Sequence, residues 1–341
     1  RSKISNPQDV KFGSQMGVIG ISHNISLGKK AFWKTVIASS SESNSTEVDS
    51  LNSEFKRHPY FFSYTSLNRI TAHSFINYKV NSKLALKYGV NFTRYGVNFT
   101  DSIYEFTYGG FISEAEVDES NFTLQTYINA NYKLNDRLVF NFGLNGIQSN
   151  ISNKKAVDPR FSANYILKPG QTLSLGVGVH SQMQPFVVYY DRTLLNFQNN
   201  TYLETNKNLD FSRNTHFILG YQRIINNLLR LKTEIYYQHL DQLPVTQNPS
   251  YYSTVNFGAD FGFPNVDSLV NKGIGRNYGV EVTLEKFFDK GYYYLLTASV
   301  FDSKYKASDN QWRNTAFNNN YVLNFLAGKE VKLKKGVLSF N

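Results

Sequence analysis

The sequence predicts an all-β protein, an antiparallel up-and-down barrel that spans a membrane, and three observations carry that prediction. Apolar and polar residues alternate with a period of two over many long segments. Short, turn-rich connectors alternate along the chain with longer polar stretches. Aromatic residues make up 16% of the 341 residues and charged residues only 18%, whereas about 25% of the residues in a typical soluble domain are charged.

The composition excludes two other classes of protein. A chain this rich in aromatic residues is not disordered. Apolar runs such as 187–190 and 292–296 are far shorter than the roughly 18 residues of a membrane helix, and the mean hydropathy is −0.39, which together exclude a helical membrane protein. The net charge of +10 suits an anionic partner such as nucleic acid, lipopolysaccharide or an acidic nutrient, although lysines and arginines scattered over wet surfaces would give the same value.

The alternation predicts strands in order along the chain. It is clearest at 84–93, 122–134, 138–145, 172–179 and 278–285. In each segment Leu, Val, Phe, Tyr or Ile recurs at every second position, with Asn, Lys, Gly, Thr or Glu between. No segment of comparable length has the 3.6-residue apolar stripe of a helix.

The connectors predict how these strands are joined. Seven short ones, rich in Asn, Gly, Lys and Pro, predict hairpins at 27–30, 80–83, 134–137, 168–171, 225–227, 289–291 and 334–336. Longer polar stretches lie between them, at 44–58, 100–119, 151–158, 185–206, 244–272 and 307–317. Membrane barrels have short turns on the periplasmic rim and long loops outside, so about fourteen strands are expected, many longer than the roughly 5 or 6 residues of soluble sheets.

In such a barrel one face of each strand meets lipid and the other meets a wet lumen. The expected lipid-facing set is Leu86, Val90, Phe140, Phe142, Leu175, Val177, Val280 and Val282. The expected lumen set is Lys87, Asn91, Asn141, Asn145, Glu281 and Glu285. A charge that faces the lipid midplane costs about 2–4 kcal/mol, so lysines and glutamates should point inward. A soluble sheet alternates in the same way, but the number and length of the strands favour the barrel.

The sequence Tyr-Gly-Val-Asn-Phe-Thr occurs twice, at 88–93 and at 95–100, with Arg94 between the copies. Because the offset of seven residues is odd, Val97 of the second copy lies on the face opposite to Val90 of the first. We therefore expect the strand to bulge or to leave the bilayer near Arg94.

The sequence contains no pattern that predicts catalysis. The six histidines are dispersed and never form a His-x-x-x-His pair, so we expect no metal site. The chain has no cysteine, and therefore no disulfide and no thiol nucleophile. No nucleophile elbow and no phosphate-binding loop lies at a strand-to-helix junction. We expect neither an enzyme nor a cofactor.

Six motifs occur in a fixed order. They are Asp-Pro-Arg-Phe-Ser at 158–162, His-Ser-Gln-Met-Gln-Pro at 180–185, Phe-Ile-Leu-Gly-Tyr at 217–221, Glu-Ile-Tyr-Tyr at 234–237, Gly-Arg-Asn-Tyr-Gly-Val-Glu at 275–281 and Tyr-Val-Leu-Asn-Phe-Leu-Ala-Gly-Lys-Glu at 321–330. Together they resemble the barrel of TonB-dependent outer-membrane receptors, in the subgroup with a carboxypeptidase-regulatory-like N-terminal extension. The resemblance extends over roughly 60–341 and is strongest after residue 158.

The resemblance implies that 1–341 form a single, partial barrel domain of about 14 strands out of about 22, without the N-terminal plug and the last strands. It implies a multi-pass protein of the Gram-negative outer membrane that takes up a scarce nutrient actively, of siderophore, oligosaccharide or peptide class. The implied partners are outer-membrane lipid, the protein's own N-terminal plug domain, the TonB energy-coupling protein and an extracellular nutrient ligand, but no nucleic acid. The alternatives are a passive porin or structural barrel, and a secreted all-β adhesin or binding protein.

Ligand contact in such a receptor is expected from the long loops. The candidates are Phe186, Tyr189, Tyr190 and Arg192 in 184–206, and Trp312 and Arg313 in 307–317. Aromatic rings stack on sugars, peptides or aromatic chelates, and a guanidinium adds bidentate hydrogen bonds. The same side chains could instead pack against neighbouring loops. The next candidate is 244–272, with Tyr251, Tyr252 and Phe257.

Overall fold

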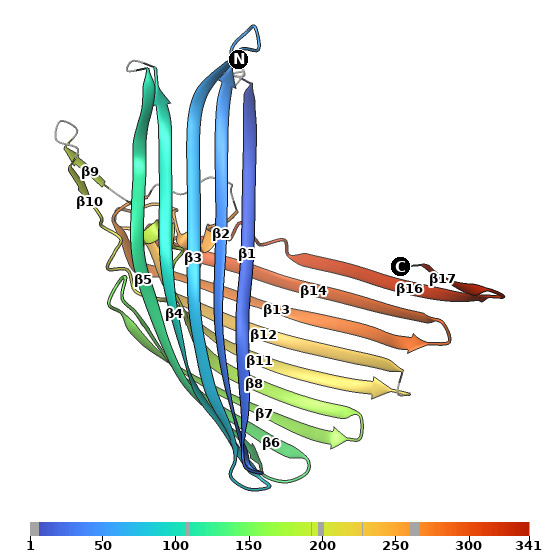
Figure 1. The fold of residues 1–341 in the computed structure, drawn as a ribbon. Coiled ribbons are helices and arrows are strands. Elements are labelled where there is room, and N and C mark those ends of the chain that lie inside the picture. The colour runs from blue at the N-terminus through green and yellow to red at the C-terminus, as the bar shows by residue number, and fades with distance from the viewer. Residues whose placement is uncertain are drawn as a thin grey trace.

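The computed structural model describes residues 7–106, 109–191, 193–196, 201–226, 228–259 and 266–340, and their fold is one large curved antiparallel sheet (Figure 1). Its strands are β1 (Gln8–Leu27), β2 (Ala31–Leu51), β3 (Arg57–Lys79), β4 (Leu84–Glu105), β5 (Gly110–Lys133), β6 (Leu138–Ser149), β7 (Lys155–Lys168), β8 (Gln171–Gln182), β11 (Ser212–Ile225), β12 (Leu229–Thr246), β13 (Leu269–Asp289), β14 (Tyr292–Lys306), β16 (Tyr321–Leu333) and β17 (Gly336–Phe340), with β15 (Trp312–Asn314) paired to β14. The smaller elements are the helix α1 (Phe186–Tyr189), the hairpin of β9 (Thr193–Asn196) and β10 (Thr201–Leu203), and the 3-10 turn η1 (Thr254–Asn256). Each strand of the large sheet pairs with the next one along the sheet, which confirms the predicted up-and-down topology.

All seven predicted hairpins are present, and local turn chemistry explains them. The side-chain oxygen of Asn81 accepts hydrogen bonds from the backbone N–H groups two and three residues further on, at 2.8 and 2.9 Å. Asn135 does the same in another turn, at 2.9 Å for both bonds. Lys290 and Gly291 both have positive φ, 53° and 80°, as the two central residues of a type I′ hairpin turn require.

The outer face of the sheet is apolar, as predicted. Val90, Phe142, Leu175, Val280 and Val282 all lie on it and are 37–49% exposed. The strand pairing places the other members of the predicted lipid-facing set on the same face, namely Leu86, Phe140 and Val177.

The inner face carries the polar residues. Lys87 and Asn141 line one cavity on this face and Glu281 lines another. The remaining members of the predicted lumen set have the same strand parity as these three, namely Asn91, Asn145 and Glu285. One face of the sheet is therefore apolar and the other polar, as expected for a membrane barrel with a lipid-facing surface and a water-filled lumen.

The tandem repeat reverses its faces within β4 without any bulge. Strand pairing continues unbroken through Arg94 on both sides, so the first of the two expected alternatives, a bulge, is wrong, whereas the second, that the strand leaves the bilayer near Arg94, stays a prediction. Val90 is 38% exposed on the outer face, whereas Val97 and Phe99 are 6% exposed and packed on the inner face. The reversal is tolerated because these inward apolar side chains lie beneath an outer loop.

Most of two predicted loops is strand. Residues 44–51, 57–58, 100–105 and 110–119 belong to the ends of β2–β5, which are 21, 23, 22 and 24 residues long and extend well past the other strands (Figure 1). About 9–11 tilted residues cross a bilayer, so these strands continue far outside it. Their sequence is rich in polar residues and lacks a long run of regular alternation, so the prediction of loops over 44–58 and 100–119 is wrong for most of their length.

The sheet has two edges. Within the described residues β1 pairs only with β2, and β17 pairs only with β16. The curved sheet is therefore open, and Figure 1 shows these edge strands well apart.

Candidate ligand-binding site

The loop between β8 and β11 folds inward over the lumen face of the sheet. Its helix α1 buries Val188 and Tyr189, which are 2% and 0% exposed, and the next residue, Tyr190, is 3% exposed. These side chains pack with the inward apolar residues Val97 and Phe99 of β4. The packing of apolar side chains from both sides holds the loop in place.

Polar contacts fix the same loop. The Gln184 backbone N–H donates to the Tyr189 hydroxyl at 3.3 Å, and the Asn121 amide of β5 donates to the Tyr190 hydroxyl at 2.5 Å. The Gln184 side chain donates to the Ser212 hydroxyl at 2.7 Å. Burial raises the pKa of the Tyr189 hydroxyl to about 12, so the phenol stays neutral and can keep this position.

A second set of contacts ties two outer loops together. Asn206 is fully buried; its side-chain oxygen accepts from the Leu269 N–H at 2.9 Å, and its amide donates to the Val266 carbonyl at 3.0 Å. The Asp210 N–H donates to the Asn271 side-chain oxygen at 2.8 Å. The loop before β11 is therefore anchored to the loop that precedes β13.

A chamber of about 720 Å³ lies between the inward-folded loop and the inner faces of β3–β5. Its walls include Tyr95, Phe186 and Phe257, and the first two rings lie 5.0 Å apart. Arg69 of β3 is the one charged side chain among the residues that line it. A concave, mostly apolar space of a few hundred Å³ with a small number of polar groups is typical of a small-molecule site.

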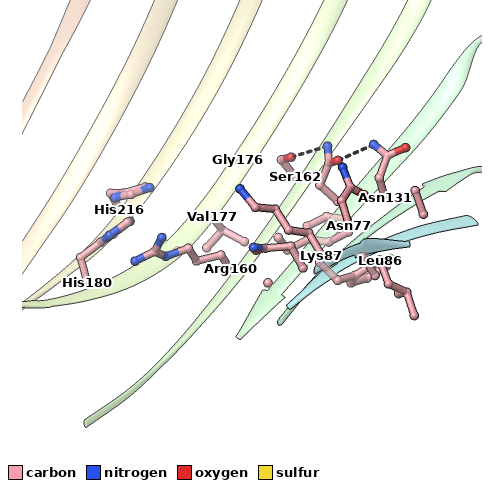
Figure 2. Close-up of a pocket in the computed structure, with 18 residues that line it drawn as sticks. Asn77, Leu86, Lys87, Asn131, Arg160, Ser162, Gly176, Val177, His180 and His216 are labelled. Atoms are coloured by element: carbon pink, nitrogen blue, oxygen red, sulfur yellow. Dashed lines mark hydrogen bonds between the residues drawn. The ribbon is translucent and has the colours of Figure 1, made fainter. Parts of the chain in front are cut away.

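A basic cleft of about 620 Å³ lies further along the same face, nearer to the short turns. Figure 2 shows the residues that line it. Lys87 and Arg160 reach into it from β4 and β7, beside the stacked rings of His180 and His216, whose centroids are 4.5 Å apart. None of the residues that line it is acidic. The cleft therefore concentrates positive charge and suits anionic groups.

Two structural details shape the basic cleft. Gly178 lies between Arg160 and the two histidines, where an added Cβ would be 3.3 Å from the Arg160 side chain and 3.4 Å from the Nε2 atom of each histidine. A larger residue would crowd this meeting point. On the opposite side, the Asn131 amide donates to Asn141 at 2.6 Å, and Asn141 donates to a serine hydroxyl at 3.0 Å, so the amides are held in fixed orientations.

A smaller cavity of about 400 Å³ lies between the two spaces. It shares His180 with the basic cleft, and Gln182, Met183 and Gln184 with the chamber. The three cavities therefore lie next to one another in a line along the inner face. That line leads from beneath the loop toward the end of the sheet with the short turns.

The structure brings together only part of the predicted ligand-contact set. Phe186 and Tyr190 line the chamber, whereas Tyr189 is fully buried behind them. Phe257, from the second candidate region, also lines the chamber. Arg192 lies outside the described residues.

Trp312 and Arg313 lie elsewhere, in β15 beside β14. Arg313 forms a bidentate ion pair with Asp309, at 2.8 and 2.5 Å, and its hydrogen bonds hold the pKa of the Asp309 carboxyl below its usual value. The Arg276 guanidinium lies over the Trp312 ring, 4.4 Å from the ring centroid. Neither residue lines the chamber.

Sequence reasoning missed Tyr95, Arg69 and the basic cleft. The odd offset of the tandem repeat was the available signal for Tyr95, because it turns the second copy inward. The sequence does not predict that Lys87 and Arg160 line the same cleft, because their proximity depends on the register of β4–β8.

Among the described residues, no group of three or more His, Asp or Glu side chains could hold a metal ion. No helix in the described part of the chain is long and apolar enough to cross a membrane.

Comparison with known proteins agrees with this architecture. The family model for the TonB dependent receptor-like β-barrel matches residues 5–331. No curated protein sequence matches the chain significantly.

Solved structures share the fold at low sequence identity. The ferric yersiniabactin uptake receptor FyuA from Yersinia pestis is 13% identical with a TM-score of 0.72, over 99% of this chain and 50% of that one. The copper transporter OprC is 10% identical with a TM-score of 0.66, over 93% and 51%. The RagAB peptide transporter is 12% identical with a TM-score of 0.60, over 96% and 39%. The chain thus spans about half the length of FyuA and OprC, and at these identities the likeness shows the fold alone.

Proposed function

The chain belongs to the family of TonB-dependent receptor β-barrels, and from that membership we propose that it forms the wall of a receptor for active uptake of a scarce nutrient. The family consists of transport receptors of the outer membrane. The observation that carries the proposal is the line of neighbouring cavities along the inner face, from the chamber to the basic cleft.

The two open edges support a proposal about the domain. Unpaired backbone groups at a sheet edge cost several kcal/mol each in lipid, so strands that cross a membrane close into a ring. We propose that 1–341 are a single, partial barrel domain whose ring is completed in the whole protein. By family membership its partners would be outer-membrane lipid, a plug domain, the TonB protein and an extracellular ligand.

The lining residues suggest the chemistry of the ligand. FyuA, OprC and RagAB are named for a ferric siderophore, copper and peptides respectively, so family membership does not choose among these classes. The aromatic rings of Tyr95, Phe186 and Phe257 would hold an apolar or aromatic body. Arg69 in the chamber and the cationic groups of the basic cleft would hold an anionic group. We propose a ligand that combines both.

These 341 residues contain no cysteine, so site-specific labelling of a thiol introduced among them gives a direct test, with the labelled unsubstituted whole protein as the baseline. Phe186→Cys in the whole protein would place one thiol in the chamber, and N-ethylmaleimide would then add bulk there. We expect uptake by cells to fall at least fivefold after labelling of this variant, in assays with a ferric siderophore, copper(II) or a short peptide as the probe. The unlabelled variant reports the effect of the substitution alone.

Trp312→Cys is the matched control, because Trp312 is exposed but lies away from the chamber. Labelling it should leave uptake within about twofold of the unlabelled value. Equal loss in both variants would argue against the chamber as the site. Uptake that persists after a protonophore collapses the energy supply would instead indicate a passive porin.

A further inference from the structure

On the outer face of β12–β15, the type of side chain changes from the middle of the strands toward their outer ends. Residues that are paired across neighbouring strands form rows on this face. From the middle outward, five of these rows are Leu231–Leu284–Leu296, Ile235–Val280–Val300, Tyr237–Tyr278–Asp302, His239–Arg276–Lys304 and Ile274–Lys306–Trp312. Apolar rows come first, an aromatic row follows, and two rows rich in cations come last. All of these residues have the parity of Val280, which is on the outer face.

The rows locate the cations relative to the membrane. Aromatic girdles mark the boundaries of the apolar band in membrane barrels, so Tyr237 and Tyr278 mark its outer boundary here. Arg276 lies two residues beyond Tyr278 on β13, about 7 Å along the strand. This is the level of lipid headgroups in the outer leaflet.

Two of the cations lack an acidic partner. In the part of the chain that the structure describes, neither Arg276 nor Lys306 forms an ion pair, and the buried Nε of Arg276 has no hydrogen-bond partner. Both lie against the ring of Trp312, with charge-to-centroid distances of 4.4 and 5.7 Å. No carboxylate in the described part of the chain therefore pairs with either of these two positive charges.

The neighbouring carboxylates are already occupied. Asp302 accepts from the Tyr278 hydroxyl at 2.8 Å and from the Asn318 amide at 2.9 Å, and it pairs with Lys304 at 3.0 Å. Asp309 is held by its bidentate pair with Arg313. These acids do not neutralise Arg276 or Lys306.

We propose that Arg276, Lys306 and Trp312 form an outer cationic patch that binds the phosphate groups of a phosphorylated lipid of the outer leaflet. A guanidinium matches phosphate geometry, and basic residues near a membrane surface bind anionic headgroups. Tryptophan prefers the interface between headgroups and acyl chains. The patch faces away from the lumen, so its role is separate from that of the chamber and does not depend on the transported ligand.

Binding of lipid A to the whole protein in detergent tests the proposal, with retention measured by native mass spectrometry. Wild-type protein should retain bis-phosphorylated lipid A in preference to dephosphorylated lipid A. The double substitution Arg276→Gln/Lys306→Gln should weaken binding about thirtyfold, if each cation contributes as a juxtamembrane lysine or arginine does. Equal retention of the two lipids by wild-type protein would overturn the proposal.

The matched control is Lys334→Gln/Lys335→Gln, which removes the same charge from the exposed turn between β16 and β17 at the opposite rim. Its affinity should stay within about twofold of wild type, and a loss equal to that of the patch variant would mean that total charge alone is responsible. Heat-modifiable migration in gels reports folding of both variants. If the patch variant does not fold, Trp312→Ala keeps both charges and should still weaken binding at least threefold; unchanged binding in Trp312→Ala would contradict the proposed patch.

Discussion

At the scale of single residues, the hydroxyl of Tyr189 makes the stability of its loop depend on pH. The side chain is fully buried, and its pKa is raised to about 12, against an ordinary value of about 10. Its contribution to loop stability is therefore complete below pH 10 and is lost as the pH rises through 12. The largest loss is about 3 kcal/mol, the equivalent of two pKa units.

We expect the segment around α1 to become sensitive to subtilisin between pH 10 and 12. Tyr189→Phe should flatten this pH dependence, while at neutral pH it costs about 1 kcal/mol because the Gln184 N–H loses its acceptor. Tyr251→Phe is the control, since Tyr251 is 70% exposed. An equally steep rise of cleavage in the Tyr189→Phe variant would show that another group is responsible.

At the scale of elements, the asparagine turns explain why the hairpins could be predicted. The Asn135 side chain accepts two backbone hydrogen bonds within its own turn, so the information is local and visible in the sequence. Asn135→Ala should lower the free energy of unfolding by about 1–2 kcal/mol, measured by urea titration in detergent. Asp136→Ala, in the same turn, should change it by less than about 0.5 kcal/mol, as surface substitutions usually do. The same loss in both would mean that the turn tolerates no change at all, and the side-chain acceptor would not be the cause.

Other elements could not be predicted, for physical reasons. The ends of β2–β5 extend past the segments that cross the membrane, where no lipid face requires apolar residues at every second position, so the regular alternation that marks a strand in lipid is absent from 44–58 and 100–119. In the candidate site, Phe186 and Tyr190 were predicted as ligand contacts. That they line one chamber with Tyr95 and Phe257 depends on the loop between β8 and β11 folding inward over the sheet. The composition of a loop does not determine whether it folds inward or outward. The stacking of Arg276 on Trp312 likewise requires the register of β13–β15.

At the scale of the whole molecule, the difference between the faces of the sheet makes a quantitative prediction. Val282 and Thr283 are neighbours on the same strand, β13, but lie on opposite faces, and Val282 is deeper in the apolar band than the boundary residue Tyr278. Val282→Lys should destabilise the protein in lipid by about 2–4 kcal/mol, because it places a charge in the apolar band. Thr283→Lys points into the lumen and should cost less than about 1 kcal/mol, and comparable losses for the two would contradict the assignment of the faces. Unfolding by urea in lipid vesicles provides the measurement.

The order of the strands also constrains any ring that contains this sheet. The path from β1 to β17 has fourteen strands, each antiparallel to its neighbours. The two edge strands therefore run in opposite directions and are already compatible as neighbours. An odd number of additional strands would force one parallel pair into the ring, which bacterial membrane barrels do not contain. Closure thus requires either direct contact between β1 and β17 or an even number of intervening strands, so the parity of the complete barrel follows from the fourteen strands alone.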